Sequence, residues 1–137
     1  MTSTNRKVLV VDDDPNILLF IETLLSSEGY NVITAVNGKE ALRACEGESP
    51  DVAFVDLVMP IMNGWEFCEA VRERGRRQIP IVVMSASADA RRASREVGAQ
   101  GYLGKPFELD QVLAYVRKLT APRSPTEGIG GDGAARS

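Results

Sequence analysis

The sequence predicts an α/β fold in which a doubly wound parallel sheet of five strands is covered by five helices. Five short apolar runs alternate along the chain with segments of helical periodicity, and this alternation is typical of a parallel sheet with helices on both faces. The runs are continuously apolar, as expected for strands that are buried on both sides. A chain of 137 residues, 44% of them hydrophobic, is long enough for one domain with a real core.

The predicted strands are the runs 7–11, 31–35, 52–56, 81–84 and 101–103. The first helix is expected to start at Asp14, an N-cap residue, with Pro15 at the first helical position. Its apolar face then repeats at helical spacing until Gly29, with Ile17, Leu18, Ile21, Leu24 and Leu25. The other helices are predicted at 39–46, 65–74 after Gly64, 89–97 and 107–119.

The domain is expected to span residues 6–120, after an N-terminal extension of residues 1–5. Residues 121–137 are rich in proline and glycine and carry little apolar surface, which predicts a disordered tail. The same composition is typical of the start of an interdomain linker.

Composition excludes several classes of function. The net charge of −3 argues against a direct nucleic-acid binder, which usually carries a basic excess. No apolar run approaches the roughly 18 residues of a membrane span and no signal peptide is visible, so we expect a cytoplasmic protein. The chain has no histidine, which removes Ser-His and Cys-His nucleophiles and imidazole metal ligands. Cys45 and Cys68 fit no zinc or CxxC spacing and are expected to be buried thiols.

Charged and hydroxyl side chains stand where the predicted strands end. Asp12 and Asp13 follow the first strand and Asp56 ends the third. Ser85 and Lys105 follow the fourth and fifth. Sites in open parallel sheets form beyond the C-terminal ends of the strands. If the first and third strands are neighbours, three carboxylates therefore meet in one crevice.

Such a crevice is suited to phosphoryl transfer. Clustered carboxylates raise one another's pKa, and Mg²⁺ relieves the repulsion because it prefers oxygen ligands. With a lysine and a hydroxyl added, the residues resemble a phosphoryl-transfer site. Asp56 is the best candidate nucleophile because it stands alone at its strand end, and its attack would give an acyl phosphate. Taken singly, each residue also fits a plainer role as a turn, capping or solvated loop residue.

These residues make the chain similar to the receiver domain of two-component response regulators. The matching segments are 10–15, 56–60 with Gly64, 84–86 and 101–107, and the resemblance covers about residues 6–120. It implies a flavodoxin-like sheet of order 2-1-3-4-5, and in size the chain is similar to a stand-alone, chemotaxis-regulator-like receiver.

The resemblance also implies roles for individual residues around the crevice. Asp56 matches the phosphoacceptor. Asp13 matches a direct Mg²⁺ ligand, and Asp12 one that usually acts through water. The backbone carbonyl of Val58 matches a further ligand of the same ion, and Lys105 matches the lysine that binds the phosphoryl oxygen.

Two more positions match the family's switch. Ser85 matches the hydroxyl that moves to the phosphate, and Tyr102 matches the aromatic ring that then turns inward. The surface implied to change comprises the fourth helix, fifth strand and fifth helix, which carry Arg91, Arg92, Arg95, Tyr102 and Lys118. For the arginines, a merely solvated helix face is the alternative.

The implied partners are a sensor histidine kinase or histidine phosphotransfer protein as donor, and a downstream protein target. No direct contact with nucleic acid or membrane is implied, and the chain would be a monomer or a weak phosphorylation-dependent dimer. It would not be an enzyme with a separate substrate, since it catalyses only its own phosphorylation and dephosphorylation.

Four alternative functions share part of this residue pattern. A haloacid-dehalogenase-type phosphatase needs a second aspartate at position 58, which is Val58. A nucleotide-binding P-loop around Lys105 needs an earlier glycine at Ala99 and a Ser or Thr at Pro106. A receiver-like scaffold that is never phosphorylated would usually lack an acid or the lysine, and none is missing here. A receiver fragment of a larger multidomain regulator stays open.

Overall fold

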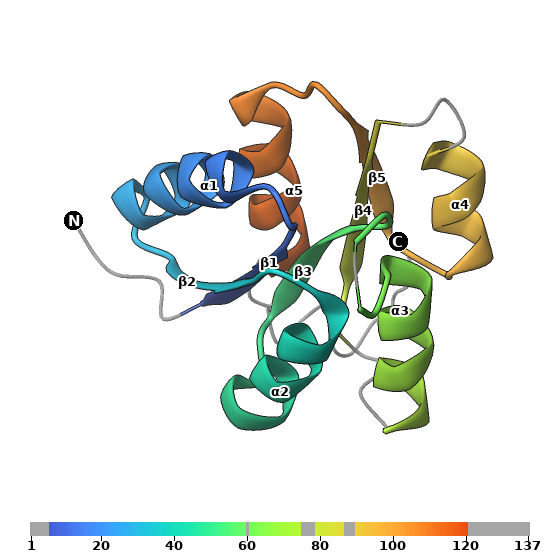
Figure 1. Cartoon of the computed structure of the whole chain (residues 1–137). Coiled ribbons are helices and arrows are strands. Elements are labelled where there is room, and N and C mark those ends of the chain that lie inside the picture. Colours follow the sequence, from blue (N-terminus) through green and yellow to red (C-terminus); the bar gives the residue numbers. More distant parts are fainter. Residues whose placement is uncertain (1–5, 60, 75–78, 87–89, 121–137) are drawn as a thin grey trace, which may run out of the picture.

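A computed structural model describes residues 6–59, 61–74, 79–86 and 90–120 of the chain (Figure 1). The strands are β1 (Lys7–Val11), β2 (Asn31–Ala35), β3 (Val52–Asp56), β4 (Ile81–Ser85) and β5 (Gly101–Gly104). The helices are α1 (Pro15–Ser27), α2 (Gly38–Glu48), α3 (Gly64–Glu73), α4 (Ala90–Glu96) and α5 (Leu109–Thr120). The predicted extension, residues 1–5, and tail, residues 121–137, lie outside the described residues.

All four strand pairs are parallel, and the strand order is β2-β1-β3-β4-β5. This confirms the predicted doubly wound α/β fold. The central strand β3 is buried over its whole length. In register, Val11 of β1 pairs with Val55, and Asp56 pairs with Met84 of β4. The C-terminal ends of β1, β3 and β4 therefore meet at one edge of the sheet.

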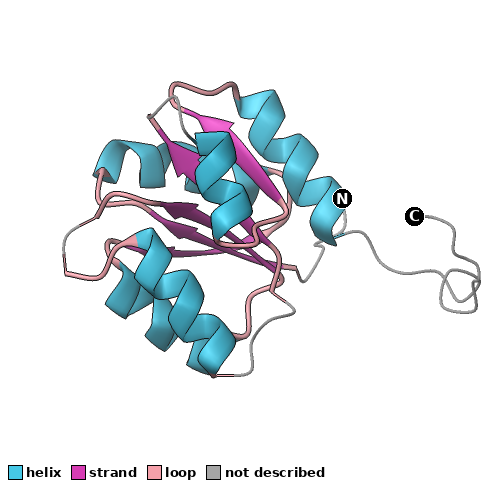
Figure 2. Ribbon diagram, turned by 90° about the vertical axis from the view of Figure 1, so that its right-hand side faces the viewer, coloured by secondary structure: helices cyan, strands magenta, loops and turns pink. Residues whose placement is uncertain are grey.

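Helices cover both faces of the sheet, and each face has its own core (Figures 1 and 2). Side chains of a strand point alternately to the two faces, so Phe54 packs with α1 and α5 while Val55 packs with α2, α3 and α4. Cys45 and Cys68 form no disulfide, and both are buried in the second of these cores. The predicted buried thiols are thereby confirmed.

Side chains cap the N-termini of several helices near the edge where the C-terminal ends of β1, β3 and β4 meet. The Asp14 carboxylate accepts a hydrogen bond from the Asn16 N–H at 2.9 Å, with Pro15 at the first helical position, so the predicted cap of α1 is confirmed. At α3, Asn63 and Glu66 form a reciprocal capping box.

The structure corrects some helix boundaries. The last helix begins at Leu109 rather than Phe107. The preceding residue, Glu108, accepts a hydrogen bond from the Gln111 N–H at its carbonyl, and its own N–H donates to the Gln111 side chain. The second helix is longer than the predicted 39–46. Asn37 caps it from the preceding residue, and it ends where Ser49 adopts a left-handed φ of 52°. Among the described residues, the fourth helix begins at Ala90. Its predicted start, Asp89, lies outside the described residues.

Among the described residues, none of the helices combines the length and apolar character needed to span a membrane.

Candidate functional site

Three carboxylates meet at the carboxyl edge of the sheet. One oxygen from each of Asp12, Asp13 and Asp56 can be chosen so that all lie within 4.8 Å of one another. Asp12 is fully buried and Asp56 is nearly so, whereas Asp13 is exposed. They converge because β1 and β3 are neighbours, as the predicted crevice requires.

Lys105 reaches this cluster from the loop after β5. Its Nζ lies 2.8 Å from Asp12 Oδ2 and 3.2 Å from Asp56 Oδ2. The lysine backbone is held to the neighbouring strand, because its N–H donates to the Ser85 carbonyl at 2.8 Å. The peptide bond between Lys105 and Pro106 is cis. The predicted approach of the lysine to the acids is therefore present.

The two oxygens of Asp12 have different surroundings. Oδ1 accepts a hydrogen bond from the Asp14 N–H at 2.9 Å. Oδ2 is buried and has no geometric hydrogen-bond partner within the described part of the chain, but it forms an ion pair with the Lys105 ammonium group at 2.8 Å. The ion pair with Lys105 is thus the contact that compensates the burial of this oxygen.

Asp56 is held by its own loop. Its Oδ1 accepts the Val58 N–H at 3.2 Å, and its Oδ2 accepts from Lys105. Gly64 lets the loop fold back onto the strand end, since a Cβ at that position would lie 2.6 Å from the Asp56 carbonyl oxygen. The side chain of Val58 is 72% exposed, so only its backbone is placed for a role in the site.

Burial and charge act together on the pKa values of the pair. Burial, and next the charge of Asp12, raise the pKa of Asp56 above its ordinary value, although Lys105 and the Val58 N–H oppose this. For Lys105, burial lowers the pKa, but its contacts with Asp12 and Asp56 outweigh burial and the net pKa is raised. Lys105 therefore keeps its positive charge at neutral pH.

Ser85 and Tyr102 lie on β4 and β5. Ser85 is buried and directly follows Met84, the residue that pairs with Asp56. It thus stands at the same edge of the sheet as the carboxylates. Tyr102 is 37% exposed on β5 at the margin of the sheet. The predicted switching roles of both residues stay predictions.

The oxygens of this edge suit Mg²⁺, which binds through one or two carboxylates and keeps several waters. Asp13 offers an exposed carboxylate, and the buried carboxylates of Asp12 and Asp56 lie beside it. The donor set contains only oxygen, with no thiol in the cluster. The predicted ligand residues are therefore brought together.

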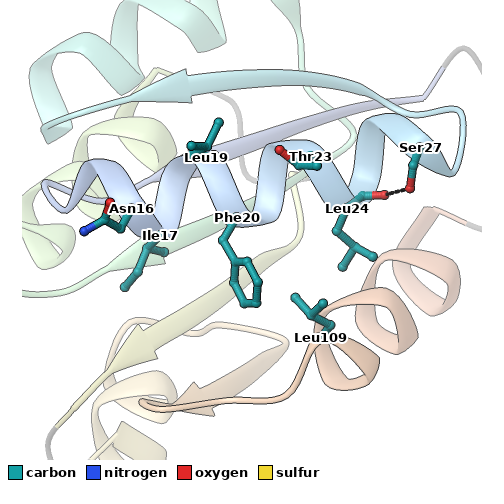
Figure 3. Close-up of a pocket in the computed structure, with 8 residues that line it drawn as sticks. All are labelled: Asn16, Ile17, Leu19, Phe20, Thr23, Leu24, Ser27 and Leu109. Atoms are coloured by element: carbon teal, nitrogen blue, oxygen red, sulfur yellow. Dashed lines mark hydrogen bonds between the residues drawn. The ribbon is translucent and has the colours of Figure 1, made fainter.

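An apolar groove, lined by α1 and by Leu109 of α5, was not predicted from the sequence (Figure 3). Leu19 and Phe20 are 63% and 52% exposed there, and Phe20 and Leu24 point toward Leu109 of α5. The available signal was that α1 is apolar around most of its circumference, beyond the stripe that faces the core.

The fold and its acidic edge define a receiver-type α/β domain. The family model described as the response regulator receiver domain matches residues 8–117, and the chain belongs to this family.

Among curated proteins, the chain is 41% identical over 125 residues to the transcriptional regulatory protein PrrA of Mycobacterium tuberculosis. It is 38% identical over 126 residues to the response regulator MprA of Mycolicibacterium vanbaalenii. Each match covers 90% of this chain but 53% and 54% of the relative. The chain thus spans about half the length of these relatives.

Solved structures agree with the fold. The chemotaxis response regulator CheY4 of Vibrio cholerae superposes with a TM-score of 0.77 and 34% identity, covering 85% of this chain and 99% of that one. The response regulator TrrA of Thermotoga maritima, solved in complex with Mg²⁺ and BeF, gives a TM-score of 0.75 and 32% identity, covering 83% and 98%.

Proposed function

We propose that this domain accepts a phosphoryl group on Asp56 from a phosphohistidine of another protein, and that the modification controls a protein partner. The observation that carries the proposal is the convergence of Asp56 with Lys105 and two further aspartates at one sheet edge. We infer further that the site phosphorylates only its own aspartate, so that the domain is not an enzyme with a separate substrate.

In the transfer step, a carboxylate oxygen of Asp56 attacks phosphorus. A new O–P bond forms while the P–N bond of the phosphohistidine breaks, and the electron pair leaves with the imidazole nitrogen. Lys105, which keeps its charge, neutralises the oxygens of the transferred group. The Val58 N–H and the fold of the loop at Gly64 hold Asp56 in place during the attack.

Mg²⁺ would be held by Asp13, Asp56 and the backbone carbonyl of Val58, with Asp12 acting through a water. When bound, it supplies charge neutralisation at the transferred phosphoryl group. The carboxylates of Asp12 and Asp13 serve here as ligands, and Asp56 alone serves as the nucleophile.

The output we propose is a shift in population of the surface formed by α4, β5 and α5. Ser85 would move toward the phosphate and Tyr102 would turn inward. Arg91, Arg92 and Arg95 of α4 and Lys118 of α5 are exposed on this surface, where they are available to a cytoplasmic protein partner. Self-association would be weak and dependent on phosphorylation.

A second candidate rests on the relatives. The matched part of this chain spans only about half the length of PrrA and MprA, and PrrA is named a transcriptional regulatory protein. On this alternative, the domain would regulate further domains of a longer protein, including one that binds DNA. Both candidates share the phosphoacceptor role of Asp56, and a scaffold that is never phosphorylated does not.

The deciding experiment is intact-mass spectrometry after incubation with acetyl phosphate and Mg²⁺. We expect one phosphoryl group that is stable to acid and labile to base on the wild type. Asp56→Asn should not be labelled, whereas Asp110→Asn, which changes an exposed aspartate of α5, should be labelled normally. An unlabelled wild type, or equal labelling of Asp56→Asn, would refute the proposal.

We place the phosphohistidine-bearing donor over the groove of α1. The donor must bring its imidazole to Asp56, so its surface must cover adjoining elements, and α1 begins at Pro15, three residues after Asp12. The groove offers Leu19 and Phe20 for apolar contact. With a purified histidine kinase that labels the wild type, Phe20→Ser should slow transfer, while labelling by acetyl phosphate stays unchanged. Equal slowing with both donors would contradict this placement.

A further inference from the structure

Tyr115 of α5 makes two hydrogen bonds to the backbone of one residue on β5. The Tyr102 N–H donates to the Tyr115 hydroxyl oxygen at 3.3 Å, and the Tyr115 O–H donates to the Tyr102 carbonyl at 3.3 Å. One hydroxyl can do both because it is a donor and an acceptor. The side chain of Tyr115 on α5 thus forms hydrogen bonds with both the N–H and the carbonyl of Tyr102 on β5.

The position on the sheet explains why these backbone groups are available. β5 is the last strand in the order β2-β1-β3-β4-β5, so among the described residues one of its sides has no neighbouring strand. The Lys105 N–H points inward, to the Ser85 carbonyl of β4. The N–H and the carbonyl of Tyr102 both meet the hydroxyl of Tyr115, a residue of α5 and not of β4, so they face the other side of the strand. Without Tyr115, the N–H and carbonyl of Tyr102 would be unpaired groups on an exposed edge of the sheet.

Gly101 makes room for the tyrosine. A Cβ on Gly101 would overlap Cε1 of Tyr115 and lie 2.5 Å from Cζ. The phenol ring therefore lies directly against the glycine Cα. It also lines a groove between β5 and α5, together with Tyr102, Gln111 and Lys118. The ring of Tyr115 thus packs against Gly101, and its hydroxyl forms hydrogen bonds with the next residue, Tyr102.

From this arrangement, we infer that Tyr115 is a positioning residue that couples α5 to the backbone of Tyr102. We call the two hydrogen bonds between the Tyr115 hydroxyl and the Tyr102 backbone the clamp. The clamp fixes the backbone from which the Tyr102 ring projects. A displacement of β5 is therefore transmitted to α5. The part of this inference that concerns signalling rests on the proposed switching role of Tyr102, whereas the clamp itself does not.

The first test is hydrogen exchange of the Tyr102 amide, followed by NMR without any phosphodonor. In Tyr115→Phe, which keeps the ring, that amide should exchange about three- to tenfold faster, as expected for loss of one hydrogen bond. Amides of β3 should keep their protection. The matched control is Tyr30→Phe, since the Tyr30 hydroxyl makes no hydrogen bond within the described residues. Equal protection of the Tyr102 amide in Tyr115→Phe and wild type would overturn the clamp.

A second variant reaches the same contact from the strand. In Gly101→Ala the new methyl should push the ring aside, because the atoms it meets are the far end of a side chain. Faster exchange of the Tyr102 amide is expected although Tyr115 is intact. The double variant with Tyr115→Phe should show little further change, and an additive effect would contradict a shared clamp.

The signalling part is tested with Mg²⁺ and beryllofluoride, which mimics the phosphate. In the wild type we expect altered exchange in β5 and α5. In Tyr115→Phe the change across α5 should shrink, while labelling of Asp56 by acetyl phosphate is unchanged. An α5 response of wild-type size would refute the coupling. A wild type that cannot be labelled would refute the proposed function instead, and would leave the result on the unphosphorylated clamp standing.

Discussion

The ammonium nitrogen of Lys105 lies 3.2 Å from Oδ2 of Asp56, although 49 positions separate the two residues in the chain. The same nitrogen lies 2.8 Å from Asp12 Oδ2. One lysine therefore balances two carboxylates that would otherwise repel each other in a buried place.

Lys105→Met should destabilise the metal-free protein at pH 7 by about 1–3 kcal/mol, the usual cost of leaving a buried polar group without its partner. The loss should shrink as the pH falls, because protonation removes the carboxylate charges. Urea unfolding at pH 7 and at pH 5 measures both effects. Lys118→Met, on the exposed side of α5, serves as control, and a similar loss there would contradict a specific role of Lys105.

Asp56→Asn should stabilise the metal-free protein at neutral pH. Burial and the charge of Asp12 raise the pKa of Asp56, so the folded state binds a proton more tightly than the unfolded state. Charged Asp56 therefore costs stability above its folded-state pKa, and this cost disappears below its ordinary pKa. The advantage of the variant should fade as acid is added. Thermal unfolding across pH measures it, and a gain that grows in acid would show the sign to be wrong.

Mg²⁺ should stabilise the wild type, by about 2.7 kcal/mol at a hundredfold excess over Kd. Its apparent affinity should fall as the pH drops through the raised pKa of Asp56, because protons and metal compete for that carboxylate. Asp13→Asn should weaken binding without unfolding the domain, because Asp13 is exposed. Melting temperatures across a Mg²⁺ titration provide the measurement. Unchanged affinity in Asp13→Asn would exclude it as a ligand.

Gly64→Ala should destabilise the domain by about 1–3 kcal/mol, the usual range for overpacking. The new Cβ would lie 2.6 Å from the Asp56 carbonyl oxygen and 2.8 Å from Leu57 Cα, which are backbone atoms that cannot move aside cheaply. Labelling of Asp56 should slow as well, since the loop that holds it must shift.

The matched control for Gly64 lies in α2. A Cβ on Gly47 meets nothing within 4 Å, and alanine is the better helix former, so Gly47→Ala should stabilise by about 0.5–1 kcal/mol. Denaturant unfolding of both variants gives the comparison. If the two alanines had the same effect, close packing at Gly64 would not be the cause.

Ile61 has a φ of 70° although it is β-branched, and its side chain is 77% exposed. Left-handed backbone costs an L-residue about 1–2 kcal/mol, and little packing is lost on truncation here. Allowing for the extra flexibility of unfolded glycine, Ile61→Gly should stabilise by about 0.5–1 kcal/mol. Ile61→Ala keeps the backbone strain and should show no such gain in chemical denaturation. A gain of equal size for alanine would point to the exposed side chain instead.

Local patterns in the sequence were sufficient to predict much of the fold. The apolar runs are continuous because a central parallel strand is buried on both faces, and β3 is buried throughout. The Asp14 cap and Pro15 could be predicted because capping depends on neighbouring residues alone. The strand ends marked the site, since parallel strands present their carboxyl ends at one edge. Asp12, Asp13, Asp56 and Lys105 do meet there.

The tertiary structure decided what depends on residues far apart in the chain. It showed that Lys105 contacts two carboxylates at once, that Oδ2 of Asp12 is buried with this lysine as its ion-pair partner, and that Tyr115 clamps Tyr102. It also left Phe20 of an apolar helix at the surface. None of these follows from local periodicity, because each requires side chains from separate elements to pack at a particular distance. The sequence by itself determined the fold class and the position of the site, and packing between elements determined the contacts within it.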